Sequence, residues 1–122
     1  MWIAEKSRSR QEPEPAAQLG QVTLPEDPAG VYLDGERRNL PVFAPGGYVW
    51  RPSRGRQVLV IKTGAGGALP CVAGERCSDQ WELEEGEVLL HSGKAVLHLR
   101  ADGTVNITGS LTVNGQPVMT AG

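Results

Sequence analysis

The residues best suited to ligand chemistry lie in one segment, FAPGGYVWRPSRGR (43–56), where aromatic side chains stand beside arginines. Aromatic rings next to guanidinium groups can stack single-stranded nucleic-acid bases, and a glycan is the other ligand that we consider for such a surface. The chain is acidic overall, with a formal net charge of −2, which gives no general attraction for nucleic acid. The simpler interpretation is that the rings fill a core or a subunit interface while the arginines lie on a loop. The possible ligand face consists of Tyr48, Trp50, Arg51, Arg54 and Arg56.

Catalytic chemistry finds no support in the rest of the chain. The two histidines are His91 and His98, and no nucleophile, base and orienting group are brought together by the sequence. His98 falls on the polar side of an alternating pattern of apolar and polar residues, so we expect it to face solvent rather than a metal. GAGG (64–67) lacks the Lys and Ser/Thr of a phosphate-binding loop, and the acidic run at 82–87 lacks calcium-loop spacing and predicts a solvated connector. We expect no catalytic residue, no cofactor and no metal, and a protein that is not an enzyme.

Cysteine usage and the absence of long apolar runs indicate where the chain is made. Cys71 and Cys77 could pair in a disulfide, but two free thiols are favoured in a reducing compartment. The first residues lack the apolar region of a signal peptide, and no run approaches the roughly 20 apolar residues that cross a bilayer. We therefore expect synthesis in a cytoplasm and no membrane-spanning segment.

The composition predicts an all-β chain with a small core. Its 122 residues include 16 Gly and 9 Pro, and only 5% are aromatic. Frequent turns and few large rings favour short strands in one small domain with an appendage. The sequence contains no convincing amphipathic helix.

Residues 19–74 contain short β-like runs separated by turns. About five short strands over this length suit a small Greek-key barrel of the oligonucleotide/oligosaccharide-binding (OB) type, and the spacing alone also fits an SH3-like barrel. Residues 1–18 are predicted to form a flexible N-terminal arm or, alternatively, a clamp on a neighbouring subunit, and residues 75–86 an acidic connector. The candidate strands are GQVTL (20–24), VYL (31–33), NLPVF (39–43), YVW (48–50), QVLVIK (57–62) and LPCVA (69–73).

Residues 87–122 carry the clearest pattern in the chain. From Leu97 to Gly115 every odd-numbered residue is apolar or glycine, and every even-numbered residue is polar, so a strand here has one apolar and one polar edge. Gly103, Gly109 and Gly115 are predicted to divide the stretch into short strands without changing this phase. A narrow apolar stripe with little near it is most simply buried against copies of itself, which predicts an intertwined β-structural oligomer. The residues expected at its axis are Leu97, Leu99, Val105, Ile107, Leu111 and Val113.

The barrel, the connector and the repeat, in this order, resemble the central spike proteins of contractile phage baseplates, the phage Mu-like spike and baseplate assembly protein V family. VYLDGERRNLPVFAPGGYVWRPSRGRQVLVIKTG (31–64) resembles the OB-domain core of the family. GEVLLHSGKAVLHLRADGTVNITGSLTVNG (86–115) resembles its glycine-punctuated β-helix.

The resemblance implies a homotrimer in which OB domains form a collar and the C-terminal strands, residues 87–122, form a short intertwined β-helix or β-prism. It implies a structural role as the central spike or hub of a contractile tail or related injection particle, in tail assembly and puncture of the target cell envelope. The implied location is the virion tail baseplate or a phage-tail-like particle, made in the bacterial cytoplasm. The implied partners are tail tube or baseplate hub proteins and a separate tip protein. Longer family members hold an iron ion at the tip through a His-x-His pair, which is missing here, so no tip metal is expected.

Two alternatives of other classes remain. One is an OB-fold module that binds single-stranded nucleic acid or glycan through the ligand face defined above. The other is a short tail-fibre adhesin that binds a cell-surface receptor. The sequence favours the structural role over both, and nucleic acid is not an expected partner.

Overall fold

The computed structural model describes residues 15–77 and 80–120, and in these residues it is all-β, as the sequence predicts, with no α-helix. The chain separates into two compact units, Met1–Cys77 and Ser78–Gly122, and every sheet lies within one unit or the other. None of the helical structure in the described part of the chain is long and apolar enough to cross a membrane.

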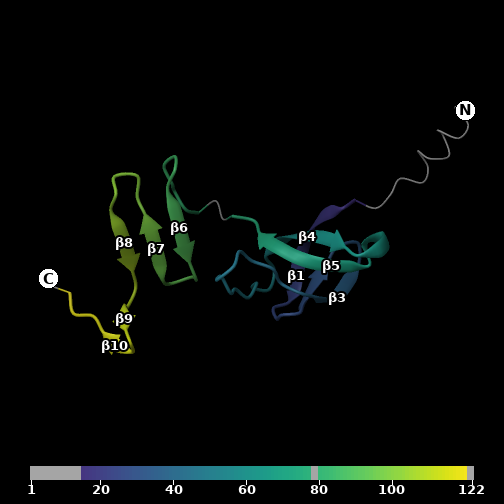
Figure 1. Cartoon of the computed structure of the whole chain (residues 1–122), viewed down its shortest axis with the longest axis horizontal. Helices are drawn as coiled ribbons and strands as arrows, with labels where there is room; N and C mark the ends of the chain where they lie inside the picture. The colour runs from purple at the N-terminus through teal and green to yellow at the C-terminus, as the bar shows by residue number, and fades with distance from the viewer. Residues whose placement is uncertain (1–14, 78–79, 121–122) are drawn as a thin grey trace, which may run out of the picture. The chain divides into compact units, whose positions relative to one another are not determined.

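The first unit is built on a five-stranded antiparallel sheet with the order β3-β2-β1-β4-β5 (Figure 1). One parallel bridge, between Val42 and Val72, joins the segment after β3 to β5. The Phe43 N–H donates to the Val72 carbonyl at 2.8 Å, but the pairing does not continue into a closed sheet. The strands are β1 (Ala17–Leu24), β2 (Ala29–Tyr32), β3 (Glu36–Leu40), β4 (Gln57–Thr63) and β5 (Leu69–Glu75).

Alternation along the strands gives the first unit a small core of its own. On β4, Val58 and Val60 point inward and are fully buried, while Leu59 and Ile61 between and after them are 40% and 38% exposed. Trp50 packs against this core from the loop before β4. The core residues are Val22, Ala29, Val31, Leu40, Val58, Val60 and Val72. The first unit therefore excludes water with residues of a single chain.

The segment between β3 and β4 differs from its prediction. The expected strand at residues 48–50 is wrong: Pro45 and Tyr48 close a turn instead, with the Tyr48 N–H donating to the Pro45 carbonyl at 3.0 Å. The Trp50 indole N–H donates to the Phe43 carbonyl at 3.3 Å, which holds the ring against the core. Only Val42 of the expected strand at 39–43 makes a bridge beyond β3.

The edges of the first unit differ slightly from the expected bounds of 19–74. β1 begins at Ala17, inside the segment predicted as an arm, because its backbone pairs with β4 as far as Ile61. Residues 1–14 of that arm lie outside the described residues. Both cysteines are free thiols, Cys71 buried and Cys77 exposed.

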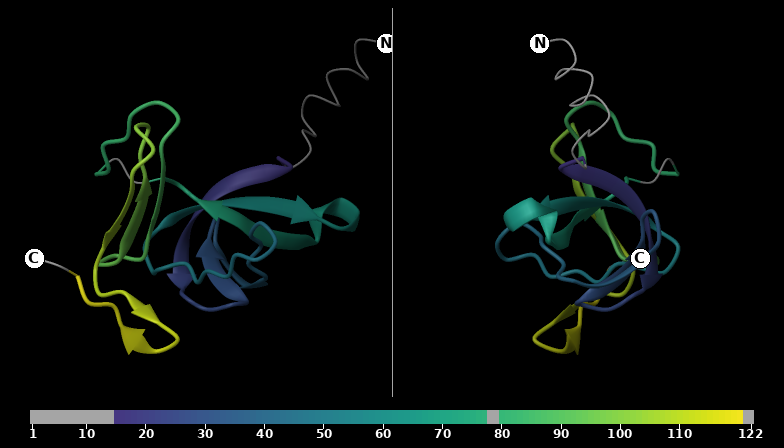
Figure 2. Two further views of the ribbon diagram at one scale, coloured as in Figure 1. Left: turned by 60° about the vertical axis from the view of Figure 1, so that its left-hand side comes forward. Right: turned by 90° about the vertical axis from the view of Figure 1, so that its right-hand side faces the viewer.

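The second unit begins with a three-stranded antiparallel sheet, β6 (Val88–His91), β7 (Val96–Leu99) and β8 (Val105–Thr108). A hairpin of β9 (Thr112–Val113) and β10 (Gln116–Pro117) follows it (Figures 1 and 2). Gly103, Gly109 and Gly115 have φ angles of 90°, 125° and 79° and lie between these strands, so the predicted break points are confirmed. Asn114 (φ 50°) and Gly115 form the two-residue hairpin turn for which positive φ is required at both positions.

The direction of the strands in the second unit is a finding that the sequence did not predict. The chain reverses between β7 and β8, so that a single chain folds as an antiparallel meander rather than winding onward in one direction. The predicted phase nevertheless survives the reversal, because Leu97 lies opposite Ile107 and Leu99 lies opposite Val105.

Gly20 in β1 provides a test of packing in the first unit. A Cβ at this position would lie 2.5 Å from Val31 Cγ1 and 3.0 Å from the Tyr32 carbonyl oxygen. Gly20→Ala should therefore lower the free energy of unfolding by about 1–3 kcal/mol, as overpacking does. Gly74→Ala on β5, where a Cβ would meet nothing within 4 Å, should change it by less than about 0.5 kcal/mol. Urea unfolding of both full-length variants measures the difference, and equal effects would contradict the steric argument.

Candidate functional site, an exposed apolar sheet face

The three-stranded sheet of the second unit has one continuous apolar face. Residues directly opposite each other on paired strands share a face, and the register places two rows of three apolar residues side by side. One row is Leu90, Leu97 and Ile107, and the other is Val88, Leu99 and Val105. We call these six residues the apolar face.

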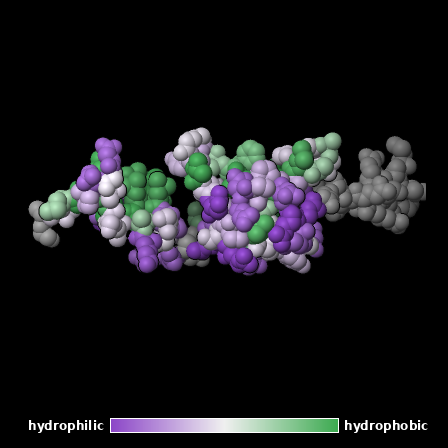
Figure 3. Space-filling model, turned by 90° about the horizontal axis from the view of Figure 1, so that it is seen from below, coloured by the Kyte–Doolittle hydropathy of each residue, from purple (hydrophilic) through white to green (hydrophobic). Residues whose placement is uncertain are grey.

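Nothing within residues 80–120 covers the apolar face. No apolar residue in this range is buried, in contrast to the first unit. Val105 is 59% exposed, Val88 49% and Ile107 48%. Figure 3 shows an apolar area on this unit between hydrophilic surfaces. Contiguous apolar surface of this kind on a folded chain marks a site of interaction.

Four of the six residues predicted at the axis come together on the apolar face: Leu97, Leu99, Val105 and Ile107. Leu111 lies just beyond β8, and Val113 lies in β9, outside the three-stranded sheet. The prediction did not include Val88 and Leu90, which fall on even positions before the alternating stretch begins. Val88, Leu89 and Leu90 are consecutive apolar residues without alternation, so only the pairing of β6 with β7 shows which of them share this face.

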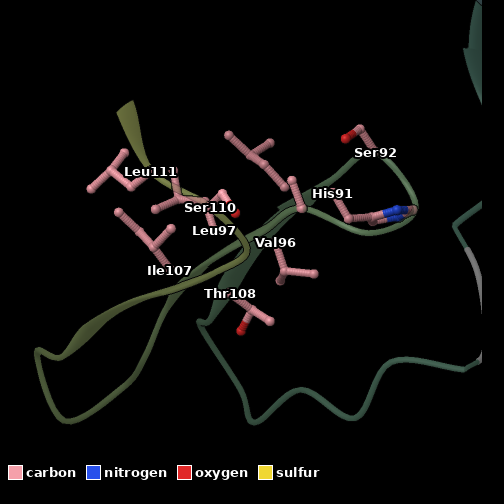
Figure 4. A pocket seen from close by; sticks show the side chains of 10 residues that line it. His91, Ser92, Val96, Leu97, Ile107, Thr108, Ser110 and Leu111 are labelled. Carbon is pink, nitrogen blue, oxygen red and sulfur yellow. The ribbon is translucent and has the colours of Figure 1, made fainter. Parts of the chain in front are cut away.

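A hollow of about 450 Å³ lies at one end of the apolar face, beside the turn between β6 and β7. Figure 4 shows Leu97, Ile107 and Leu111 gathered on one side of the ribbon, with Val96 and Thr108 pointing to the other side. The hollow is lined mainly by apolar atoms, so an apolar side chain suits it better than a charged ligand.

The opposite face of the sheet, called the polar face below, carries His98 and Asn106 beside Leu89 and Val96, and its polar contacts centre on the Glu87 carboxylate. Its Oε2 accepts the Ala101 N–H at 2.7 Å, and its Oε1 accepts the Glu84 N–H at 3.1 Å. The His98 Nε2 lies 3.1 Å from the same Oε1. The pKa of Glu87 is lower than its ordinary value of 4.5 because its ionised form accepts hydrogen bonds. The largest contribution comes from the Ala101 N–H, followed by the Glu84 N–H, and His98 adds a smaller one.

The segment before β6 folds back along this polar face. The Trp81 ring lies over His91 of β6, with ring centroids 4.8 Å apart. The expectation that His98 faces solvent is wrong: it stands on the polar side, but its side chain is only 16% exposed because Glu87 covers it. Nor is Glu87, at the end of the acidic run, solvated, since its side chain is 8% exposed. Within residues 80–120, side chains of the segment before β6 thus cover part of the polar face, whereas the apolar face stays exposed.

The possible ligand face of the first unit is only partly assembled. Tyr48 and Trp50 line a hollow of about 230 Å³ with Phe43 and with residues 73–75 of β5. None of the three arginines lines it. Arg56 Nε lies 4.0 Å from the Glu75 carboxylate at the rim, and Arg51 and Arg54 are exposed on the loop before β4. The aromatic residues therefore gather as the ligand hypothesis requires, whereas the arginines do not join them.

No group of three or more His, Cys, Asp or Glu residues that could hold a metal ion occurs within residues 15–77 and 80–120. A scan against protein-family models finds no match for this chain, and a search of curated proteins finds no significant relative. Any functional proposal therefore rests on the two faces of the second unit and the hollow of the first.

The Glu87 contacts predict a specific dependence of stability on pH. Because the pKa of Glu87 is lower in the folded than in the unfolded chain, its contribution is complete above pH 4.5 and is lost as the pH falls through the lowered value. Wild type should be more stable than Glu87→Gln above pH 4.5, and the two should converge in acid. Circular dichroism during urea unfolding at several pH values measures this. The exposed Glu85→Gln variant serves as the control and should follow wild type throughout.

Proposed function

We propose that the protein is the structural subunit of a homotrimer that serves as the central spike or hub in the baseplate of a contractile phage tail or related injection particle. Its role is mechanical, in tail assembly and in puncture of the target cell envelope, and not catalytic. The observation that carries the proposal is the apolar face, which residues 80–120 leave exposed although they cover part of the opposite face of the same sheet.

These features favour further copies of the same chain as the partners that bury the apolar face. Every copy carries the same face, so three copies arranged around an axis bring three apolar faces together and need no other partner. Full burial of an exposed apolar side chain contributes about 1.5–3 kcal/mol, and these six are already about half-buried, so their burial gives on the order of 5 kcal/mol per chain before conformational entropy is subtracted. The outer strands β6 and β8 have free edges, which strands of neighbouring copies can pair with.

The first unit supports the collar that the resemblance implies. Its sheet order, together with the bridge from the segment after β3 to β5, gives the succession β1-β2-β3-β5-β4-β1, which is that of an OB-fold barrel. A unit with a core of its own can hold neighbouring tail components while the second unit supplies the trimer. We propose tail tube or baseplate hub proteins and a separate tip protein as partners, and the tail of a particle assembled in the bacterial cytoplasm as the location.

The mass of the full-length protein in solution tests the trimer directly. One chain has a mass of 13.0 kDa, so light scattering on a size-exclusion column should give about three times this value, with a species that persists in mild denaturant. A stable particle with the mass of one chain would overturn the proposal.

A matched pair of substitutions on β8 tests whether the apolar face is what joins the copies. Ile107→Asp places a charge on the apolar face, and the desolvation of that charge should dissociate the trimer into single chains. Asn106→Asp adds the same charge at the next residue on the polar face, opposite His98, and should leave the trimer mass unchanged. Light scattering of both variants decides the matter. Retention of the trimer by Ile107→Asp would place the interface elsewhere.

A binding module for single-stranded nucleic acid or glycan is the second candidate, and the aromatic hollow of Phe43, Tyr48 and Trp50 is the observation that favours it. On this hypothesis Tyr48→Ala should abolish binding of an oligonucleotide or oligosaccharide probe through loss of stacking, and Arg51→Ala with Arg54→Ala should abolish binding of the oligonucleotide. On the structural hypothesis neither variant alters the trimer mass. A short tail-fibre adhesin is a weaker third candidate. Loop substitutions that change the host range and leave particle assembly intact would support it.

A further inference from the structure

The outer edge of β5 is only partly paired. β5 is the last strand of the five-stranded sheet and has a strand, β4, on one side only. On the other side the segment after β3 bridges it at Val72, whose N–H donates to the Pro41 carbonyl at 2.9 Å. The bridge is isolated, and over residues 73–75 no strand within residues 15–77 pairs with this edge. An unpaired strand edge offers backbone donors and acceptors to another extended chain.

The aromatic hollow of about 230 Å³ lies along this unpaired stretch. Residues 73–75 line it together with Phe43, Tyr48 and Trp50. Phe43 still pairs with β5, and the chain then leaves the strand in the turn that Pro45 and Tyr48 close. Phe43 and Tyr48 are each 58% exposed, and the lining is mainly apolar, so the hollow suits an apolar side chain.

The charge at the hollow is negative rather than positive. Glu75 lines it, and none of the arginines of the possible ligand face does. The nearest cation to the Glu75 carboxylate is Arg56 Nε, at 4.0 Å, which is the outer limit of an ion pair, and the Arg56 side chain is 53% exposed. A nucleic-acid phosphate would therefore meet a carboxylate at this site, whereas a basic side chain would meet an opposite charge.

We infer that the unpaired edge of β5 and the aromatic hollow together bind an extended peptide segment of a partner protein. An aliphatic side chain of the peptide enters the hollow, and a basic side chain two residues further along pairs with Glu75. Side chains two residues apart in a strand share a face, so both reach the same side of the added strand. The backbone edge favours a peptide over a base or a sugar, because only a peptide continues the hydrogen-bond ladder of a sheet. The inference does not depend on the proposed trimer, since all of these residues lie in the first unit.

An array of seven-residue peptides tests the side-chain preference. The background is serine and threonine, and the third and fifth residues run through every pair of natural amino acids. The full-length protein should be retained best by peptides with an aliphatic third residue and lysine or arginine at the fifth. Retention by no peptide, or retention without this preference, would overturn the inference.

Glu75→Lys tests the assignment of the charged contact. This variant should exchange the preference at the fifth residue from basic to acidic. Asp34→Lys makes the same change of charge in the turn between β2 and β3, away from the hollow, and should keep the wild-type preference. A misfolded variant would bind neither set of peptides, so the gain of acidic peptides separates a change of specificity from a loss of structure. An unchanged preference in a folded Glu75→Lys variant would contradict the assignment.

Fluorescence anisotropy with the best peptide tests the hollow and the edge separately. Tyr48→Ser should raise the Kd at least 10-fold, whereas Tyr32→Ser on β2, which is similarly exposed at 53% and does not line the hollow, should leave it within about 2-fold. In an added strand, alternate peptide N–H groups face the sheet. N-methylation of one alternate set should therefore raise the Kd at least 10-fold and that of the other set should not, and equal effects would contradict edge pairing.

Two further measurements separate this inference from the other proposals. Tighter binding of a thymidine oligonucleotide or an oligosaccharide than of any peptide would overturn it in favour of the binding-module candidate. Light scattering gives the mass of the same preparation. A trimer that binds no peptide would overturn the inference and leave the proposed function standing, and a single-chain mass with peptide binding would do the reverse.

Discussion

A β-sheet needs a second layer against at least one of its faces, because three strands alone cannot remove their apolar side chains from water. In the second unit β7 pairs with a strand on each side, and the segment before β6 covers part of the polar face through Glu87 and Trp81. The missing layer lies on the side of Leu97 and Ile107. The proposed trimer follows from this imbalance, since identical copies can each supply the layer that the others lack.

The first unit stands in contrast because it completes its own interior. Seven buried side chains from five strands, with Trp50 packed against them, form a core that requires no second chain. Its exposed apolar residues, such as Leu19 and Tyr32, alternate with buried neighbours instead of forming the whole of a face. The first unit thus has a complete core within its own strands, whereas the second exposes one whole face of its sheet, which is why we propose the second as the site of association.

The sequence was sufficient where structure depends on neighbours along the chain. The glycine breaks, the Asn114–Gly115 turn and the shared face of Leu97 and Ile107 follow from strand periodicity and backbone freedom, which act over a few residues. The positions of Val88 and Leu90 depend on pairing across a turn, which periodicity does not specify. The expected strand at 48–50 was wrong for a similar reason, although the Trp50 ring packs against the core as the simpler interpretation predicts. The OB barrel and the trimeric rod remain predictions.

Glu87 also bears on how the meander finds its alignment during folding. In a strand pair, a slip of one residue moves each side chain to the opposite face, which here would put His98 and Asn106 among leucines. Such a slip displaces one strand by about 3.3 Å along the other, enough to separate the Glu87 carboxylate from both the Ala101 N–H and His98. The contacts of the Glu87 carboxylate with His98 and the Ala101 N–H therefore favour the native register of β6 against β7, because both form only in the register that keeps the polar and apolar sides apart.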